Sequence, residues 1–473
     1  MRKTKIICTL GPACNNEATI EQMLKNGMNV ARFNFSHGTH EYHYEMMKMF
    51  RAVRDRLKLP AAVMLDTKGP EIRLGTFEGD KVTVKTCDEF TLTTRSVVGN
   101  EREVSISYAD LPSQLIPGTK ILIDDGKVLL RVKECTETDI ICTVEFGGII
   151  SNRKSINIPR VHLSMPYMSK QDEEDVIFGI EQNVDFIAAS FVRSKEDMIT
   201  LRKFVNYHGG HNIKLIAKIE NNEGVDNFDD ILKYSDGIMV ARGDMGVEIE
   251  YERLPGIQKK FIRKCYQSGK MVITATQMLE SMIHSKTPTR AEITDVANAD
   301  FDGTSAVMLS GETAAGDHPA LVVKVMSKIA RQAEADAFDM FAYQGINYDD
   351  DYTDVTNAIC DAAATTARDI DADAIIAVTK SGFTARRVSK FRPKQPIIAA
   401  TPELTTFHQL SLSWGVFPVL SLNQTDTDSL FKHAVDCAKQ IDLVSAGDKV
   451  VITAGVPLNL VGMTNLLKVQ IVQ

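Results

Sequence analysis

Two short segments of this sequence carry side chains that could hold a divalent metal ion beside a cation. Residues 218–221 read Lys-Ile-Glu-Asn and residues 241–244 read Ala-Arg-Gly-Asp, and each segment ends a short apolar run. If the runs are neighbouring parallel strands, Glu220 and Asp244 meet at one edge, where two carboxylates suit a hard cation such as Mg²⁺ (or Mn²⁺). Lys218 shares the strand face of Glu220, so its ammonium could neutralise phosphate charge in a transition state. A salt-bridge cluster at the rim is the alternative interpretation.

Two earlier segments supply cations and oxygen donors to the same predicted edge. Arg32, Asn34 and Ser36 alternate along the chain and so share one face, and a second polar segment spans residues 66–73. Arg32 and Arg73 are the stronger indication, because a guanidinium can bind phosphate through two hydrogen bonds. The oxygen donors make a weak cage that suits a monovalent ion better than Mg²⁺, and a network of caps and turns is the alternative. These donors are Asn34, Ser36, Asp66 and Thr67.

A hydroxyl and a separate loop complete the candidate sites. Thr276 follows another apolar run, although an isolated threonine there is commonly only a β-former. Residues 379–384 lie between the apolar run 374–378 and a basic helical segment, which is the arrangement of a phosphate site at a helix amino end. A plain strand-to-helix turn is the alternative. The candidate phosphate ligands are Thr379, Lys380, Ser381, Gly382 and Thr384.

Eight short apolar runs are the elements that would position these side chains. Each is nearly continuously apolar and ends in a polar cluster, as parallel strands buried on both faces do. Helix-length segments follow most of the runs, and eight such units close into a TIM barrel whose site lies at the carboxyl ends of the strands. The runs are residues 5–8, 30–33, 61–65, 186–190, 214–219, 237–240, 271–274 and 306–309.

The barrel pattern is interrupted once. Between Gly69 and Tyr167 the apolar residues alternate with polar ones, and residues 124–126 (Asp-Asp-Gly) predict a hairpin turn. Helix signals resume at Ser169, with Asp172 in the position of a capping box. We therefore predict a small all-β barrel domain inserted after the third strand, where it can act as a lid.

A new pattern of alternating strand and helix signals begins past about residue 342. Apolar runs at 374–378, 396–400 and 449–453 alternate with helix-like segments, which predicts an open α/β sheet with a parallel core. The predicted fold class is thus α/β. Residues 1–69 and 167–341 are expected to form the TIM (β/α)8 barrel catalytic domain, residues 70–166 the inserted β-barrel lid domain, and residues 342–473 the C-terminal α/β domain with the candidate phosphate site.

Composition narrows the class of function. The chain has 473 residues and a net charge of −8, which argues against nucleic acid as a partner. It opens without the apolar core of a signal peptide and contains no apolar run of roughly 18 residues, so we expect no membrane partner. The eight cysteines form no CxxC pair, which indicates reduced thiols and a cytoplasmic location.

The assembled motifs closely resemble those of the pyruvate kinases, and the match runs essentially end to end. Long motifs in the right order carry the resemblance: RFNFSH at 32–37, LDTKGPEIR at 65–73, KIEN at 218–221, MVARGDMG at 239–246, ITATQML at 273–279, PTRAE at 288–292 and VMLSGET at 307–313. The resemblance implies transfer of the phosphoryl group of phosphoenolpyruvate to ADP, giving ATP and pyruvate. It also implies a homotetramer and a phosphorylated allosteric effector bound at residues 379–384. The type implied is the bacterial one without an extra C-terminal swivel-like domain.

The resemblance also assigns roles, position by position. Glu220 and Asp244 would hold Mg²⁺, and the backbone at Gly243 and Asp244 would receive the substrate carboxylate. Lys218 and Arg32 would stabilise the phosphoryl group, and Thr276 would place the enolate and its proton donor. Arg73 and Lys154 would reach the nucleotide phosphates, whereas Asn34, Ser36, Asp66 and Thr67 match the family's K⁺ ligands.

Glu71 adds a prediction of its own. Family members with glutamate here look potassium-dependent, whereas those with lysine supply that charge internally, so we expect a requirement for K⁺. Ser155 and Met463 depart from common family residues without removing a ligand.

Two other functions compete with the kinase. The nearer is a magnesium-dependent lyase or aldolase acting on pyruvate or phosphoenolpyruvate, which would not need Arg73 or Lys154. The other is an inactive metabolite sensor using the loop at 379–384.

Overall fold

Eight parallel strands close into a barrel at the centre of the molecule. The structure, a computed structural model, describes residues 1–340, 354–424, 426–457 and 463–473. The barrel order is β1-β17-β16-β15-β14-β13-β3-β2, closing on β1. The predicted runs coincide with these strands to within a residue or two, because both faces of each are buried. The strands are β1 (Lys5–Thr9), β2 (Val30–Asn34), β3 (Ala62–Asp66), β13 (Phe186–Ala189), β14 (Lys214–Ile219), β15 (Gly237–Ala241), β16 (Met271–Ala275) and β17 (Ala306–Leu309).

Helices surround the barrel, and their ends match the sequence signals. Ser169 and Asp172 form the predicted capping box of α4, and Thr289 and Glu292 form that of α10. The helices are α1 (Glu17–Asn26), α2 (His40–Arg56), α4 (Lys170–Glu181), α5 (Lys195–Tyr207), α6 (Asn222–Asp226), α7 (Phe228–Tyr234), α8 (Arg242–Glu248), α9 (Leu254–Gln267), α10 (Arg290–Phe301), α11 (Gly311–Ala314) and α12 (Pro319–Asp339), with 3-10 turns η1 (Pro12–Cys14), η2 (Tyr251–Arg253) and η3 (Glu280–Ile283).

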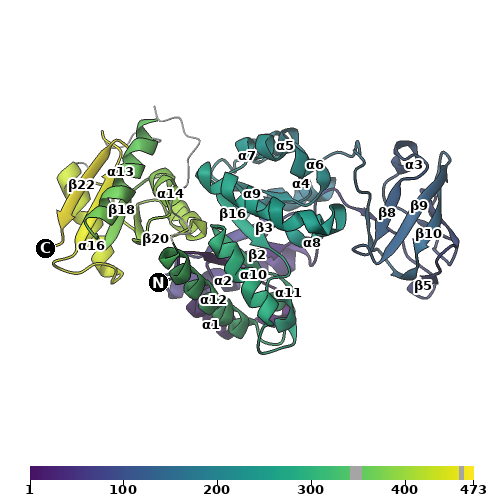
Figure 1. The fold of residues 1–473 in the computed structure, drawn as a ribbon, viewed down its shortest axis with the longest axis horizontal. Helices are drawn as coiled ribbons and strands as arrows, with labels where there is room; N and C mark the ends of the chain where they lie inside the picture. The colour runs from purple at the N-terminus through teal and green to yellow at the C-terminus, as the bar shows by residue number, and fades with distance from the viewer. Residues whose placement is uncertain (341–353, 425, 458–462) are drawn as a thin grey trace.

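The inserted segment forms a curled β domain with its own apolar core, at one end of the molecule in Figure 1. Seven strands follow the order β4-β12-β8-β9-β10-β6-β7, and β11 pairs with β5. The two edges approach closure, because Leu74 bridges Ile106 and the Ser107 amide donates to the Arg73 carbonyl. The strands are β4 (Ile72–Arg73), β5 (Lys81–Val84), β6 (Glu89–Thr93), β7 (Glu103–Ser105), β8 (Lys120–Ile123), β9 (Val128–Cys135), β10 (Asp139–Phe146), β11 (Gly148–Ser151) and β12 (Ser155–Asn157).

The hairpin predicted at residues 124–126 joins β8 to β9. Asp124, Asp125 and Gly126 all have positive φ, the backbone that tight antiparallel turns need. The domain also holds one helical turn that the sequence did not indicate, α3 (Leu111–Gln114). Four residues are too few to show a helical period.

The C-terminal part forms an open sheet at the other end of the molecule (Figure 1). Its order is β20-β19-β18-β21-β22, and the parallel core was predicted, whereas the edge strand β22, which pairs antiparallel with β21, was not. The predicted domain boundary at 341/342 lies outside the described residues, and the domain limits stay predictions. The elements are α13 (Val355–Asp369), β18 (Ala374–Val378), α14 (Phe383–Lys390), β19 (Ile397–Thr401), α15 (Leu404–Gln409), η4 (Leu410–Leu412), β20 (Val416–Leu420), α16 (Thr427–Gln440), β21 (Lys449–Ala454) and β22 (Leu466–Ile471).

The C-terminal sheet is docked on the amino-end face of the barrel. Leu412 is fully buried and belongs to the same apolar cluster as the side chains that fill the barrel interior. The Lys5 ammonium donates to the Val416 carbonyl at 2.6 Å, and the Gln409 side chain donates to the Asn212 carbonyl at 2.8 Å. Through these contacts the amino-end face of the barrel and the C-terminal part of the chain share one apolar core. Across the parts of the chain that the structure describes, no helix is long and apolar enough to cross a membrane.

Candidate active site

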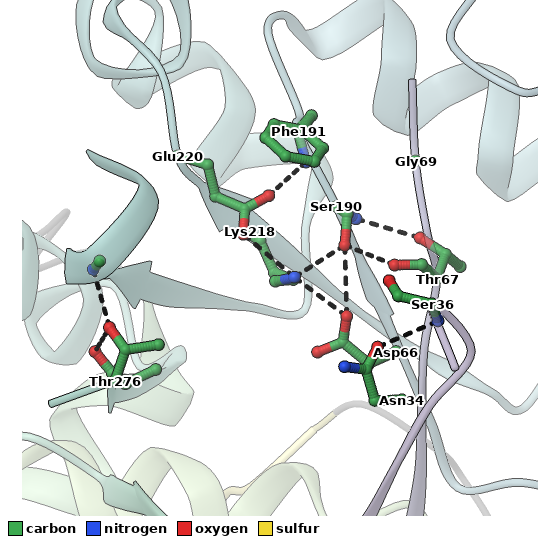
Figure 2. A network of polar contacts seen from close by, with 12 residues as sticks. Asn34, Ser36, Asp66, Thr67, Gly69, Ser190, Phe191, Lys218, Glu220 and Thr276 are labelled. Atoms are coloured by element: carbon green, nitrogen blue, oxygen red, sulfur yellow. Dashed lines mark hydrogen bonds and ion pairs between the residues drawn. The ribbon is translucent and has the colours of Figure 1, made fainter. Parts of the chain in front are cut away.

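A lysine held between two carboxylates forms the centre of the candidate site. Lys218, near the end of β14, places its Nζ 3.0 Å from Asp66 Oδ1 and 3.0 Å from Glu220 Oε1. It also donates to Ser190 Oγ at 2.7 Å. Figure 2 shows these four side chains pointing toward one another from β14, β3 and the end of β13. The carboxyl ends of separate barrel strands thus meet at one point, as a TIM barrel requires.

Lys218 remains charged in this setting. Burial lowers its pKa, but the charges of Asp66 and Glu220 outweigh burial and raise the pKa well above its ordinary value. Burial likewise opposes ionisation of Asp66, and Arg32 and Lys218 overcome it and lower the pKa of that carboxyl. The Arg32 Nε donates to Asp66 Oδ2 at 2.7 Å, and the Arg32 Nη1 donates to Thr9 Oγ1 at 2.8 Å. Two fixed cations therefore flank one carboxylate.

Glu220 and Asp244 fit a divalent cation. Burial raises the pKa of Glu220 to about 7, and the charge of Asp244 adds to the rise while Lys218 opposes it. Burial also raises the pKa of Asp244. A buried carboxylate and a half-buried one, both with a raised pKa, form a pair of oxygen donors whose charge a metal ion would compensate. Within the described part of the chain, no three acidic, histidine or cysteine side chains form a metal-binding group. The other positions would fall to water and substrate, which suits Mg²⁺.

The turn after β16 faces the first turn of α8. The Gly243 amide donates to Thr276 Oγ1 at 2.8 Å, and that hydroxyl donates to the Ala275 carbonyl at 2.6 Å. Thr276 and Gln277 have φ of 67° and 53°, so the turn is held in left-handed backbone that side chains disfavour. Thr276 lies apart from the Lys218 group in Figure 2.

Arg242 holds this turn through hydrogen bonds to its backbone carbonyls. Its guanidinium donates to the Thr276 carbonyl at 2.7 Å and to the Ala275 carbonyl at 3.3 Å, and it meets Asp295 Oδ1 on α10 at 2.7 Å. Because Arg242 begins α8, a single side chain joins that helix, the strained turn and α10.

The four predicted K⁺ donors lie at the ends of β2 and β3, where Asn34 is in register with Asp66. Asn34 Oδ1 accepts from the Ser36 amide at 3.1 Å, and Thr67 Oγ1 accepts from the Ser190 amide at 3.1 Å. Asp66 is their one carboxylate, and Arg32 and Lys218 already compensate its charge. Neutral oxygens beside a compensated carboxylate fit a monovalent cation rather than a divalent one.

A cleft of about 910 Å³ separates the barrel rim from the inserted domain. Arg73 and Lys154 line it from the inserted domain, and Asp244 lines it from the barrel. Arg73 donates to Glu71 through two hydrogen bonds of 2.8 and 3.0 Å, and the Lys154 ammonium lies 2.8 Å from Asp124 Oδ1. Both nucleotide candidates therefore face the cleft with a carboxylate partner that an incoming phosphate would have to displace. The cleft is large enough for a nucleotide.

The predicted effector loop lies far from this cleft, between β18 and α14 of the C-terminal sheet. Thr379 and Thr384 are buried, and the Thr384 hydroxyl is 2.8 Å from Thr464 Oγ1. Gly382 has φ of 77°, and a Cβ there would meet Arg386 at 2.5 Å. Lys380 is half exposed, 3.9 Å from Glu403. Of the five candidates, Lys380 and Ser381 have the more accessible side chains.

Sequence reasoning missed two residues of this region. Ser190 is 1% exposed, and its Oγ lies 3.2 Å from Asp66 Oδ1 and 2.6 Å from the Thr67 carbonyl, so it links Lys218 to the β3 end. The available signal was a serine as the last residue of the apolar run 186–190. Arg242 stood in the quoted segment 241–244, but its contact with Asp295 joins residues 53 positions apart and no local pattern reveals it.

Comparisons with known proteins agree over the whole chain. The family model described as pyruvate kinase, barrel domain, matches residues 1–323, and the one described as pyruvate kinase, alpha/beta domain, matches residues 357–470. A pyruvate kinase from Clostridium acetobutylicum is 47% identical, with 100% of both chains covered. One from Staphylococcus haemolyticus is 46% identical over 100% of this chain and 81% of its own. The crystal structure of a pyruvate kinase from Cryptosporidium parvum superposes with a TM-score of 0.94 at 41% identity, covering 100% of this chain and 96% of that one.

Proposed function

The chain belongs to the pyruvate kinase family, and on that premise we propose how its residues transfer the phosphoryl group of phosphoenolpyruvate to ADP. The products are ATP and pyruvate, and the enzyme is a phosphotransferase of glycolysis. The comparisons do not support the lyase or aldolase alternative. They name an enzyme throughout, which also disfavours an inactive sensor.

The observation that carries the proposed mechanism is the charge arrangement around Lys218. Phosphoryl transfer asks little covalent chemistry of a protein and depends on positioning and charge neutralisation. Lys218 and Arg32 are buried cations held by Asp66, so their charges stay in place without solvent reorganisation. We assign to both the stabilisation of the phosphoryl group in flight.

Glu220 and Asp244 would hold the magnesium or manganese ion, which when bound would neutralise negative charge on the substrate. The Gly243 and Asp244 amides, in the first turn of α8, would receive the substrate carboxylate. Thr276 would orient the enolate and its proton donor, because its hydroxyl is held beside the first turn of α8 by its own bond to the Ala275 carbonyl. The substrate carboxylate would replace that hydroxyl as the acceptor of the Gly243 amide. On the other side of the cleft, Arg73 and Lys154 would bind the nucleotide phosphates.

The finer assignments rest on family membership and on the geometry above. Asn34, Ser36, Asp66 and Thr67 would hold K⁺, and the loop at 379–384 would bind a phosphorylated effector. The homotetramer and the cytoplasmic location stay predictions.

Replacing Lys218 tests the mechanism most directly. Lys218→Met removes a charge that acts mainly on the transition state, so turnover should fall about 100- to 1,000-fold while magnesium affinity changes little. A coupled assay of ATP formation from phosphoenolpyruvate and ADP measures turnover, and metal titration measures affinity. Lys203→Met, which removes an exposed lysine of α5, is the matched control. Unchanged turnover in Lys218→Met would show that this cluster is idle.

A further inference from the structure

A second cleft, of about 510 Å³, lies on the opposite face of the barrel, against α14 of the C-terminal sheet. It opens at the amino ends of β14, β15 and β16, where Lys214 and Met271 begin their strands and Asp236 precedes one. Its lining is strongly basic. The lining holds one acidic side chain, Asp236, against six basic ones: Arg202, Lys214, Lys233, Lys270, Arg386 and Arg387.

The Asp236 carboxylate is already bonded to residues on the barrel side of the cleft. Its Oδ2 accepts from Arg202 Nη2 at 2.6 Å and from the Leu215 amide at 2.9 Å, and its Oδ1 lies 3.8 Å from the Lys214 ammonium. Lys233 pairs with Asp230 at 3.0 Å. The one carboxylate of the lining therefore leaves most of the positive charge uncompensated.

The three remaining cations contact neutral oxygens. Arg386 donates to the Ser381 carbonyl at 3.0 Å, Arg387 donates to Asn357 Oδ1 at 3.3 Å, and Lys270 donates to the Lys233 carbonyl at 3.0 Å. Among the residues that the structure describes, no carboxylate forms an ion pair with any of the three. Their side chains are held by acceptors that neutralise no charge.

The pKa values of two lysines in the lining are lowered by this arrangement. Burial lowers the pKa of Lys270, and the charge of Arg387 lowers it further while Asp236 opposes the fall. Burial likewise lowers the pKa of Lys214, where Arg386 and Arg202 add to the fall. Groups that repel one another in a low-dielectric concavity attract an anion strongly.

We propose that this cleft is a binding site for a small phosphate monoester, separate from the active site and from the phosphate site expected around Lys380, although Phe383 of the loop at 379–384 lines the cleft. Guanidinium groups match the oxygens of a phosphate through paired hydrogen bonds, and Arg386 and Arg387 lie on adjacent positions of one helix beside Lys270. The volume admits a molecule the size of a sugar phosphate or nucleoside monophosphate. Tyr234 and Phe383 supply aromatic surface for its organic part.

The site is placed to influence the chemistry at the other end of the barrel. β14 begins with Lys214 at the cleft and ends beside Lys218 and Glu220, and β16 begins with Met271 and ends before Thr276. Arg386 also touches the backbone of the effector loop. An anion that draws Lys214 and Arg386 together would tie the C-terminal sheet to the strands that carry the catalytic residues.

Three variants, each aimed at one candidate anion site, separate the possibilities. Isothermal titration calorimetry would measure binding of inorganic phosphate, a pentose phosphate and a nucleoside monophosphate to the full-length protein. Lys214→Gln with Lys270→Gln removes two charges of the cleft, Lys380→Gln alters the loop, and Lys218→Met alters the active site. One saturable binding event should be weakened in the double variant and unchanged in the other two variants. We expect its Kd to rise at least about tenfold, because charge-assisted hydrogen bonds are lost. Raising ionic strength should weaken the same event.

A charge-preserving variant keeps the test independent of folding. Lys214→Arg with Lys270→Arg should retain the binding event, and the thermal midpoint should show that all variants are folded. The proposal is overturned if none of the three probes binds the wild type saturably outside the active site. It is equally overturned if the glutamine pair leaves every binding event unchanged, or if Lys380→Gln abolishes the same event.

Discussion

At the scale of single residues, the active site depends on charges that are fixed before substrate arrives. Lys218, Arg32 and Asp66 are each buried, and each compensates another. Burial alone would favour the neutral form of every one of them. Each group therefore stays ionised because an opposite charge lies beside it.

Glu71 allows a test of the monovalent ion. Glu71 lines the cleft of about 910 Å³ between the barrel and the inserted domain. Its carboxylate pairs with Arg73, and its negative charge contributes to raising the pKa of Asp244. Glu71→Lys puts a cation in that position, and the variant should retain most of its turnover in potassium-free buffer, unlike the wild type. Glu71→Gln, which adds no cation, should still need potassium. Full wild-type turnover in buffer lacking both potassium and ammonium would contradict the prediction.

Asp185 makes stability depend on pH. The carboxylate is buried before β13 and accepts from the Val63 amide at 2.8 Å, and burial raises its pKa to about 7. A carboxyl with a raised pKa in the folded protein stabilises it in acid. That contribution is lost as pH rises from the ordinary value of about 4 through 7, by on the order of a few kcal/mol.

Asp185→Asn should therefore reduce the loss of stability that the protein shows as pH rises. Thermal midpoints at pH 5 and pH 8 measure the effect, and we expect the wild type to fall more than the asparagine variant between them. Asp361→Asn, at an exposed position of α13, serves as the control. Equal declines in the wild type and Asp185→Asn would rule out Asp185 as the source.

At the scale of elements, Arg242 is the residue that holds the strained turn after β16. Arg242→Lys keeps the charge but cannot reach Asp295 and the carbonyls of Ala275 and Thr276 together. A displacement of the Thr276 hydroxyl should lower kcat on the order of 100-fold, with little change in the KM for ADP. Arg263→Lys, on an exposed arginine of α9, is the matched control. A parallel loss of thermal stability without loss of kcat would give Arg242 a purely structural role.

Elements were predictable where local chemistry decides them. The barrel strands are buried on both faces, so their apolar runs are nearly continuous, and the boxes at Ser169 and Thr289 mark helix starts by their own hydrogen bonds. β20 and β22 escaped prediction. The first contains Pro418, which strand patterns reject, and the second is an edge strand whose residues are half exposed or exposed.

The candidate site was predictable to the extent that its residues follow strands. Lys218, Glu220 and Asp66 meet because parallel strands end together. The contacts of Ser190 and the left-handed backbone at Thr276 and Gln277 could not be found in this way, because they arise from contacts across the barrel rim. The same holds for the pairing of Arg73 with Glu71 and of Lys154 with Asp124.

At the scale of the whole molecule, the C-terminal part of the chain supplies Leu412 of η4 to the barrel core. Leu412→Ala would leave a cavity in the floor of the barrel and should destabilise the protein by about 2–5 kcal/mol. Thermal or denaturant unfolding measures the loss. Leu422→Ala, at a leucine that is 69% exposed, should change stability little. If both variants were equally stable, the docking would not contribute to the core.

The inserted domain is joined to the barrel by two segments: residues 66–73, which run from the end of β3 to β4, and residues 158–169, which run from β12 to α4. At one end of the first segment Asp66 grips Lys218, in the middle the Gly69 amide is tied to Asp172, and at the other end Arg73 faces the nucleotide cleft. The first of these segments therefore connects the Lys218 cluster directly to the nucleotide side of the cleft. A movement of the inserted domain toward a bound nucleotide would be transmitted along residues 66–73 to Asp66, and so to the lysine at the phosphoenolpyruvate site.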